Sequence, residues 1–135
     1  MADADTDRLA AQRPLSPHLT IFKPILTMMM SIAHRITGAG LYVGMALLTL
    51  FLLGVAIGGD AFAAVAWIAS GFIGNLIILM IVWAIFHHLL GGVRHAFWDR
   101  GLYMDPQGRE LMAQGTLVGG ILLTLLLYIF KTLAS

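Results

Sequence analysis

Residues 61–93 read AFAAVAWIASGFIGNLIILMIVWAIFHHLLGGV and contain no Asp, Glu, Lys or Arg. A membrane-spanning helix needs about 20 predominantly apolar residues, so this stretch is long enough to cross a bilayer. Two further stretches without these charged residues, 36–59 and 111–130, meet the same requirement. The sequence therefore predicts an all-α integral membrane protein with three transmembrane helices.

The composition agrees with this class, because 59% hydrophobic and 11% charged residues are not typical of a soluble protein. There is no cysteine, which excludes disulfides, covalent c-type haem and an iron–sulfur cluster held by this chain. The net charge is only +1, and the lysines and arginines form no basic stripe, so we expect no nucleic-acid partner. We predict a cytoplasmic and interfacial segment, 1–26, and a transmembrane domain, 27–135, with helices at about 27–57, 61–98 and 111–132.

The lysines and arginines predict the orientation. Cytoplasmic loops are enriched in these residues, and seven of the eight lie before the first span, at its start, or between the second and third spans. The seven are Arg8, Arg13, Lys23, Arg35, Arg94, Arg100 and Arg109, and the eighth is Lys131. We expect a bacterial inner membrane protein with a cytoplasmic N-terminus and a periplasmic C-terminus.

Small residues recur four positions apart on each predicted span, which allows close approach between membrane helices. Three helices cannot cover all of these faces by themselves, so the chain is expected to join a multi-subunit helical bundle. Ordinary glycine enrichment of membrane helices is the alternative explanation. The pairs are Gly40 and Gly44, Ser70 and Gly74, and Gly115 and Gly119.

Ionisable residues crowd the end of the second span, where they are costly and therefore indicate a functional site. His88, Gly92, His95 and Asp99 share one helical stripe. An imidazole beside small residues leaves room for a flat macrocycle, so we predict a non-covalent haem with His88 as axial iron ligand. The adjacent His87 lies on another face and could also bind iron. The alternative is that these histidines only pack or reach towards the membrane surface.

A second cluster lies on the first span. Ser31 and Arg35 are four residues apart and share a face, where they could hydrogen-bond a quinone oxygen while Asp99 or His95 relays protons. His34, Arg35, Arg94 and His95 are expected to surround the haem near its propionates. Because His34 is expected closer to the membrane surface than His88, we expect the second axial ligand to come from another chain.

Two motifs carry a family resemblance. Residues 31–38, SIAHRITG, resemble the S-x-x-H-R-x-[ST]-G signature of succinate dehydrogenase cytochrome b subunits, and residues 88–99, HLLGGVRHAFWD, resemble that family's second signature, H-x(3)-G-x-R-H-x(3)-D. The resemblance extends over about residues 12–135. It implies a membrane anchor of succinate:ubiquinone oxidoreductase, or respiratory complex II, which works with a flavoprotein subunit, an iron–sulfur subunit and a small membrane-anchor subunit.

The same resemblance implies roles for individual residues. It gives His88 as axial ligand of one haem b shared with the small anchor subunit, and Ser31, Arg35 and Asp99 as quinone-site residues. It also implies that this chain alone does not oxidise succinate, and that ubiquinone is the substrate it helps to reduce. Two alternatives stay open: a fumarate reductase anchor that works with menaquinone, and a structural membrane subunit without a cofactor.

Overall fold

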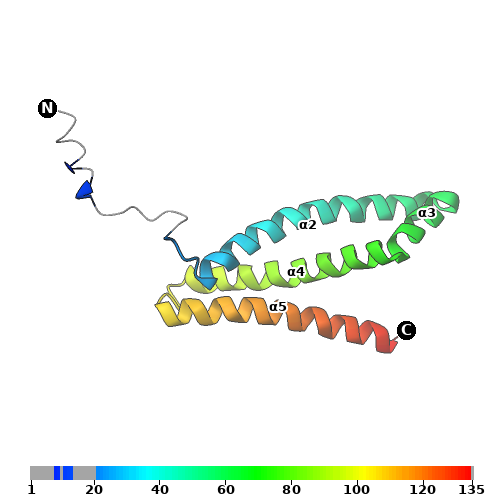
Figure 1. The fold of residues 1–135 in the computed structure, drawn as a ribbon. Coiled ribbons are helices and arrows are strands. Elements are labelled where there is room, and N and C mark those ends of the chain that lie inside the picture. Colours follow the sequence, from blue (N-terminus) through cyan, green and yellow to red (C-terminus); the bar gives the residue numbers. More distant parts are fainter. Residues whose placement is uncertain (1–7, 10, 14–20, 135) are drawn as a thin grey trace.

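The computed structural model of the protein describes residues 8–9, 11–13 and 21–134, and Figure 1 shows its fold. In this part of the chain the long elements are the helices α2 (Leu26–Ile57), α3 (Gly59–Ser70), α4 (Phe72–Trp98) and α5 (Pro106–Ala134). α2, α4 and α5 are long and apolar enough to cross a membrane. The predicted all-α class with three spans is therefore confirmed. Much of the expected interfacial segment before residue 27 lies outside the described residues.

The helix α4 is the central element of the bundle, because it packs against both α2 and α5. α2 and α5 also touch each other, but less extensively. The start of α2, the end of α4 and the start of α5 lie at the same end of the molecule (Figure 1). This end carries the histidines of α2 and α4, and we call it the histidine end.

The second predicted helix is interrupted at Gly71, whereas the apolar pattern predicts one helix over 61–98. Gly71 has an extended backbone, with φ −65° and ψ 165°, and separates α3 from α4. The Asn75 side chain donates hydrogen bonds to the carbonyls of Ser70 (2.7 Å) and Gly71 (3.0 Å). A Cβ at Gly74 would collide with the carbonyls of Ile68 and Ala69, so only glycine fits there. The apolar composition concealed this break, because it continues through both helices.

The third span begins earlier than expected, at Pro106 rather than near residue 111. Asp105-Pro106 is typical of a turn in the sequence, but in the structure these residues form the start of the helix. The Asp105 carboxylate accepts a hydrogen bond from the Gly108 N–H at 2.9 Å, which is the usual arrangement for a helix N-cap. Proline is favoured at the first helical position because its missing N–H needs no partner there.

Small residues bring the helices together, while the large apolar side chains point outwards. Ala113 is fully buried, Gly44 packs against Ile81 of α4, and a Cβ at Gly119 would come within 2.8 Å of Leu90. By contrast, a Cβ at Gly40 or Gly115 would meet no atom within 4 Å, so these two glycines do not mediate contacts within this chain. An inside-out distribution of this kind suits a bundle surrounded by lipid and by other subunits.

Candidate functional site

The imidazoles of His34 and His88 stack on each other at the interface between α2 and α4. Their ring centroids are 3.9 Å apart and their planes differ by 5°. Glycines on the facing helices make room for both rings. A Cβ at Gly38 of α2 would lie 2.9 Å from Cε1 of His88, and a Cβ at Gly91 of α4 would collide with the His34 ring. Each helix therefore places one histidine ring against a glycine of the other helix.

The His88 ring is also held by hydrogen bonding. Its Nδ1 lies 3.1 Å from the main-chain carbonyl oxygen of His34 and 3.5 Å from the Thr37 hydroxyl. A carbonyl oxygen only accepts hydrogen bonds, so Nδ1 must carry the proton and donate it. The neutral ring then has its lone pair on Nε2, and no hydrogen bond among the described residues engages that nitrogen.

The structure corrects the expectation that His34 lies at a different depth from His88. α2 begins at Leu26 and α4 ends at Trp98. At 1.5 Å per residue, His34 is therefore about 12 Å and His88 about 15 Å from their respective helix ends. The two rings lie at the same level, as their stacking requires. The depth argument for a second ligand from another chain is therefore wrong.

His87 occupies a different environment from its neighbour. It is fully buried, and its backbone and Cβ lie against Gly120 of α5, where a Cβ would come within 3.3 Å of the His87 Cα. Its ring stacks on Trp83 at 5.0 Å, and neither ring nitrogen has a hydrogen-bond partner among the described residues. His88, in contrast, is only partly buried. A large ligand could reach the partly exposed His88 from outside the chain, whereas the His87 side chain is fully buried.

Arg94 and His95 lie one turn before the end of α4 and point in different directions. Arg94 is 1% exposed, and its guanidinium carbon lies 5.0 Å from the centroid of the Trp98 ring. None of its three nitrogens has a hydrogen-bond partner in the part of the chain that the structure describes. His95 is partly buried, with its ring 5.3 Å from that of His34. The structure therefore brings His34, His88 and His95 together, while Arg94 is directed into the bundle.

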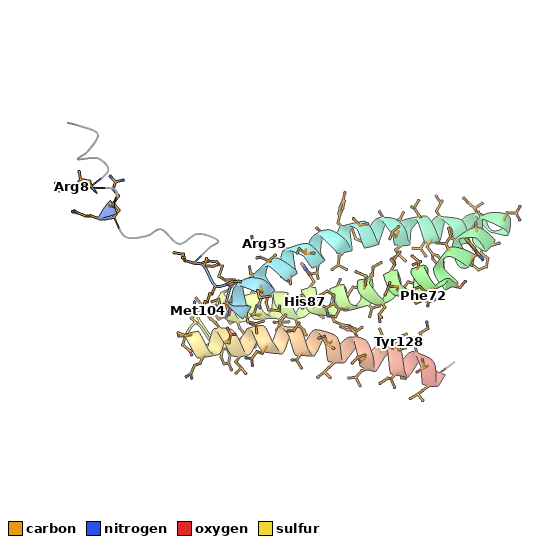
Figure 2. All side chains as sticks on the ribbon, in the orientation of Figure 1. Arg8, Arg35, Phe72, His87, Met104 and Tyr128 are labelled. Carbon is orange, nitrogen blue, oxygen red and sulfur yellow. The ribbon has the colours of Figure 1, made fainter. Side chains whose placement is uncertain are left out.

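The predicted quinone residues lie nearer the surface. Ser31 is partly buried, whereas Arg35 of α2 is exposed (Figure 2). Asp99 is exposed and forms the C-cap of α4, where its N–H donates to the His95 carbonyl at 2.8 Å. Within the described part of the chain, these three side chains make no hydrogen bond or ion pair with one another. A pocket formed by them would need contributions from outside this chain.

Sequence reasoning missed the supporting residues of the site. Thr37, Gly38 and Gly91 all stand inside the quoted motifs, but no role was assigned to them. Each follows a histidine or an arginine of a motif within three residues, and this closeness was the available sign that it belongs to the site. What the sequence could not show is that the Thr37-Gly38 pair of α2 lies against His88 of α4.

The residues around His88 fit the attachment of a haem to one side of this chain. The Nε2 lone pair is the donor that haem iron takes from histidine. Gly92, one turn further along α4, is exposed and has open space where a Cβ would be. The site thus combines an imidazole whose Nδ1 faces an acceptor with open space at Gly92.

Comparison with known proteins gives the family. A model for the succinate dehydrogenase/fumarate reductase transmembrane subunit matches residues 10–127. A succinate dehydrogenase cytochrome b556 subunit from Paracoccus denitrificans is 35% identical over 123 residues, which cover 91% of this chain and 93% of that protein. A succinate dehydrogenase cytochrome b560 subunit from Reclinomonas americana is 36% identical over 122 residues, with 87% and 85% coverage.

A third relative is the cytochrome b556 subunit of Rickettsia conorii, which is 32% identical over 118 residues, with 87% and 92% coverage. These matches extend over nearly the full length of both partners, and the two motifs lie inside the matched region. The resemblance seen in the sequence is confirmed: the chain belongs to the succinate dehydrogenase/fumarate reductase transmembrane subunit family and is similar to its succinate dehydrogenase cytochrome b members.

Proposed function

We propose that this chain is the membrane-anchor cytochrome b subunit of a succinate:quinone oxidoreductase and that it binds one haem b. The observation that carries the proposal is the state of His88. Its Nδ1–H is committed to the His34 carbonyl at 3.1 Å, which leaves the Nε2 lone pair for iron. The names of the relatives support the same conclusion, since they are cytochrome b subunits.

In this proposal His88 is one axial ligand, and a small membrane-anchor subunit supplies the other. His34 would not be that second ligand, because its ring already stacks on the His88 ring at 3.9 Å. When bound, the haem supplies a one-electron carrier within the membrane. His34, His95 and Arg35 would lie near the bound haem, and Arg94, which is directed into the bundle in this structure, would have to turn towards the propionates to pair with them.

Quinone reduction is proposed for the surface near Ser31, Arg35 and Asp99. Reducing a quinone to a quinol adds two electrons and two protons, so negative charge develops on the ring oxygens. A hydroxyl and a guanidinium one helical turn apart can donate hydrogen bonds to that charge. Asp99, exposed at the end of α4, can pass protons from the aqueous side.

The proposed partners are a flavoprotein subunit, which oxidises succinate, and an iron–sulfur subunit, which delivers its electrons to the membrane. This chain alone does not oxidise succinate. The histidine end faces the cytoplasm of a bacterial cell in this scheme, which places the N-terminus inside and the C-terminus in the periplasm. The cationic residues that flank α2, α4 and α5 at that end support this orientation.

The first test is a dithionite-reduced minus oxidised spectrum of the complex, purified through this chain in mild detergent. We expect a b-type signal that His88→Ala abolishes and that His87→Gln retains. A signal that survives His88→Ala and disappears with His87→Gln would make His87 the ligand. A complex with all its subunits and no haem would favour a cofactor-free anchor.

A second test separates succinate oxidation from fumarate reduction. Initial rates with a ubiquinone analogue and with a menaquinone analogue are compared in both directions on the same complex. We expect faster succinate:ubiquinone turnover. Faster quinol-driven fumarate reduction with the menaquinone analogue would identify a fumarate reductase anchor.

A further inference from the structure

We propose that the main-chain carbonyl of His34 fixes the orientation and tautomer of His88, with Thr37 and Gly38 as positioning residues. The inference rests on the proposed haem function. It adds a role for the Thr-Gly pair that ends the first motif, namely to prepare a ligand that belongs to the second motif. α2 would then contribute to the haem site through its backbone.

The first step of the argument is the hydrogen bond from His88. The Nδ1···O distance to the His34 carbonyl is 3.1 Å, within the normal range for an N–H donor. This acceptor permits only the tautomer with the proton on Nδ1. The other tautomer would place an N–H on Nε2, where iron needs a lone pair. The contact therefore selects the ligating form before any haem arrives.

Thr37 lies beside this acceptor. It is 5% exposed, and its hydroxyl lies 2.9 Å from the Ala33 carbonyl and 3.0 Å from the His34 carbonyl. Since the hydroxyl proton goes to the α2 backbone, the lone pairs of the same oxygen remain available to His88 Nδ1 at 3.5 Å. Thr37 thus adds a second, weaker acceptor beside the His34 carbonyl.

Gly38 provides the space that the hydrogen bond requires. A Cβ at this position would lie 2.9 Å from Cε1 and 3.4 Å from Nδ1 of His88. An alanine would therefore push the imidazole away from the His34 carbonyl. Gly91 likewise provides space for the His34 ring, which stacks on one face of the His88 ring. The ring is thus restrained at its edge and on one face.

An outer hydrogen bond of this kind alters the properties of a histidine–metal bond. A partner that accepts from Nδ1–H makes the imidazole a stronger donor, and losing such partners typically weakens metal binding by about 10–100-fold. A stronger donor stabilises ferric haem and lowers its reduction potential. Both the retention of haem and its potential should therefore depend on Thr37 and Gly38.

The experiment compares Thr37→Val with Thr37→Ser in the detergent-purified complex. Valine keeps the shape of threonine without the hydroxyl, and serine keeps the hydroxyl. We measure the haem midpoint potential by redox titration and the rate of haem transfer to excess apomyoglobin. For Thr37→Val we expect a higher potential and about tenfold faster haem transfer, with both values returned towards wild type in Thr37→Ser.

Gly38→Ala tests the same contact by a different route, and Gly40→Ala is its matched control on α2. A Cβ at Gly40 meets no atom within 4 Å of this chain. We expect Gly38→Ala to raise the potential and to speed haem transfer, and Gly40→Ala to change neither.

The outcomes separate this inference from the proposed function. If His88→Ala abolishes haem while Thr37→Val and Gly38→Ala match wild type in potential and transfer rate, the positioning role is wrong and the ligand assignment stands. Equal shifts in Thr37→Val and Thr37→Ser would also overturn the role of the hydroxyl. If His88→Ala retains haem, both the ligand assignment and this inference fail.

Discussion

The two ends of this bundle differ in what holds the helices in place. At the histidine end, aromatic and polar side chains from α2 and α4 interlock through glycines that a neighbouring ring fills. At the opposite end, α3 and the start of α4 are shaped by the backbone itself, around Gly71 and Gly74. Large aromatic side chains there are exposed, Trp67 at 79% and Phe72 at 80%, while the smaller Val65 of α3 packs against Gly54 of α2. Substitutions around the stacked rings should therefore affect the proposed haem, and those at the other end only the fold.

The largest effect on stability is expected at Gly74. Alanine there would meet the carbonyls of Ile68 and Ala69, which cannot move without altering the helix break. We expect Gly74→Ala to destabilise the protein by about 1–3 kcal/mol, measured as a lower unfolding midpoint in a denaturing detergent, with an unchanged haem spectrum. Gly71→Ala is the control, because its Cβ would have ordinary contacts at 3.6 Å and φ is −65°. A haem spectrum altered by Gly74→Ala would remove the distinction between the two ends.

The next effect concerns quinone reduction at the histidine end. Arg35 is exposed, so Arg35→Met should leave the fold intact while removing a charged hydrogen-bond donor. A hydrogen bond to a charged group contributes about 1.5–3 kcal/mol, so we expect quinone reductase activity to fall about 10–100-fold. Succinate oxidation with a soluble artificial acceptor should be unchanged. Equal losses in both assays would indicate an assembly defect and contradict the quinone role.

An aspartate from each end of the bundle allows a direct test of proton delivery. Asp99→Asn should slow quinone reduction about tenfold if the carboxylate delivers protons, at the lower limit expected for general acid–base catalysis. Asp60→Asn is the matched control, because Asp60 lies in the first turn of α3 at the opposite end. Identical quinone reduction rates across pH in Asp99→Asn and wild type would exclude the proton-transfer role.

Arg94 tests whether the buried charge at the histidine end has a partner in the complex. A buried, unpaired guanidinium is costly, and Arg94 makes no hydrogen bond within the described residues. We expect Arg94→Met to speed haem transfer to apomyoglobin by about tenfold, because the proposed propionate partner is lost. The exposed Arg100→Met is the control. Unchanged haem transfer together with a more stable protein would mean that the guanidinium has no anionic partner.

The smallest effect is expected where α2 meets α5. The Thr27 hydroxyl donates to the Glu110 carboxylate at 3.2 Å and links the starts of the two helices. Thr27→Val should cost about 1 kcal/mol of stability, again measured as an unfolding midpoint. Thr49→Val is the control, since Thr49 is exposed and donates to the Met45 carbonyl of its own helix. Equal midpoints for the two variants would show that this link does not hold the histidine end together.

Much of the architecture could be predicted from local composition. Uncharged stretches identified three membrane spans because apolar length alone decides whether a helix can cross the bilayer. The helix break at Gly71 was missed, since its signal is backbone geometry within an apolar run. The start of α5 was placed too late for a similar reason: Asp-Pro is typical of a turn and of a helix N-terminus alike.

The candidate site divides in the same way. Helical spacing separated His88 from His87, because residues one position apart lie about 100° apart around a helix. It could not show that His34 reaches His88, since the relative depth of two helices is set by how they pack. Helical spacing likewise could not predict that the Arg94 side chain is buried and contacts Trp98.

The class of protein, its three spans, its two histidine motifs and its family can all be read from the amino-acid sequence. These follow from composition and from short-range patterns, which do not depend on how helices meet. Helix packing, in contrast, brings His88 to the His34 carbonyl, makes Gly38 and Gly91 the spaces for the stacked rings, and encloses His87 against α5. Each of these depends on the register between two helices, which is set by packing between residues far apart in the chain.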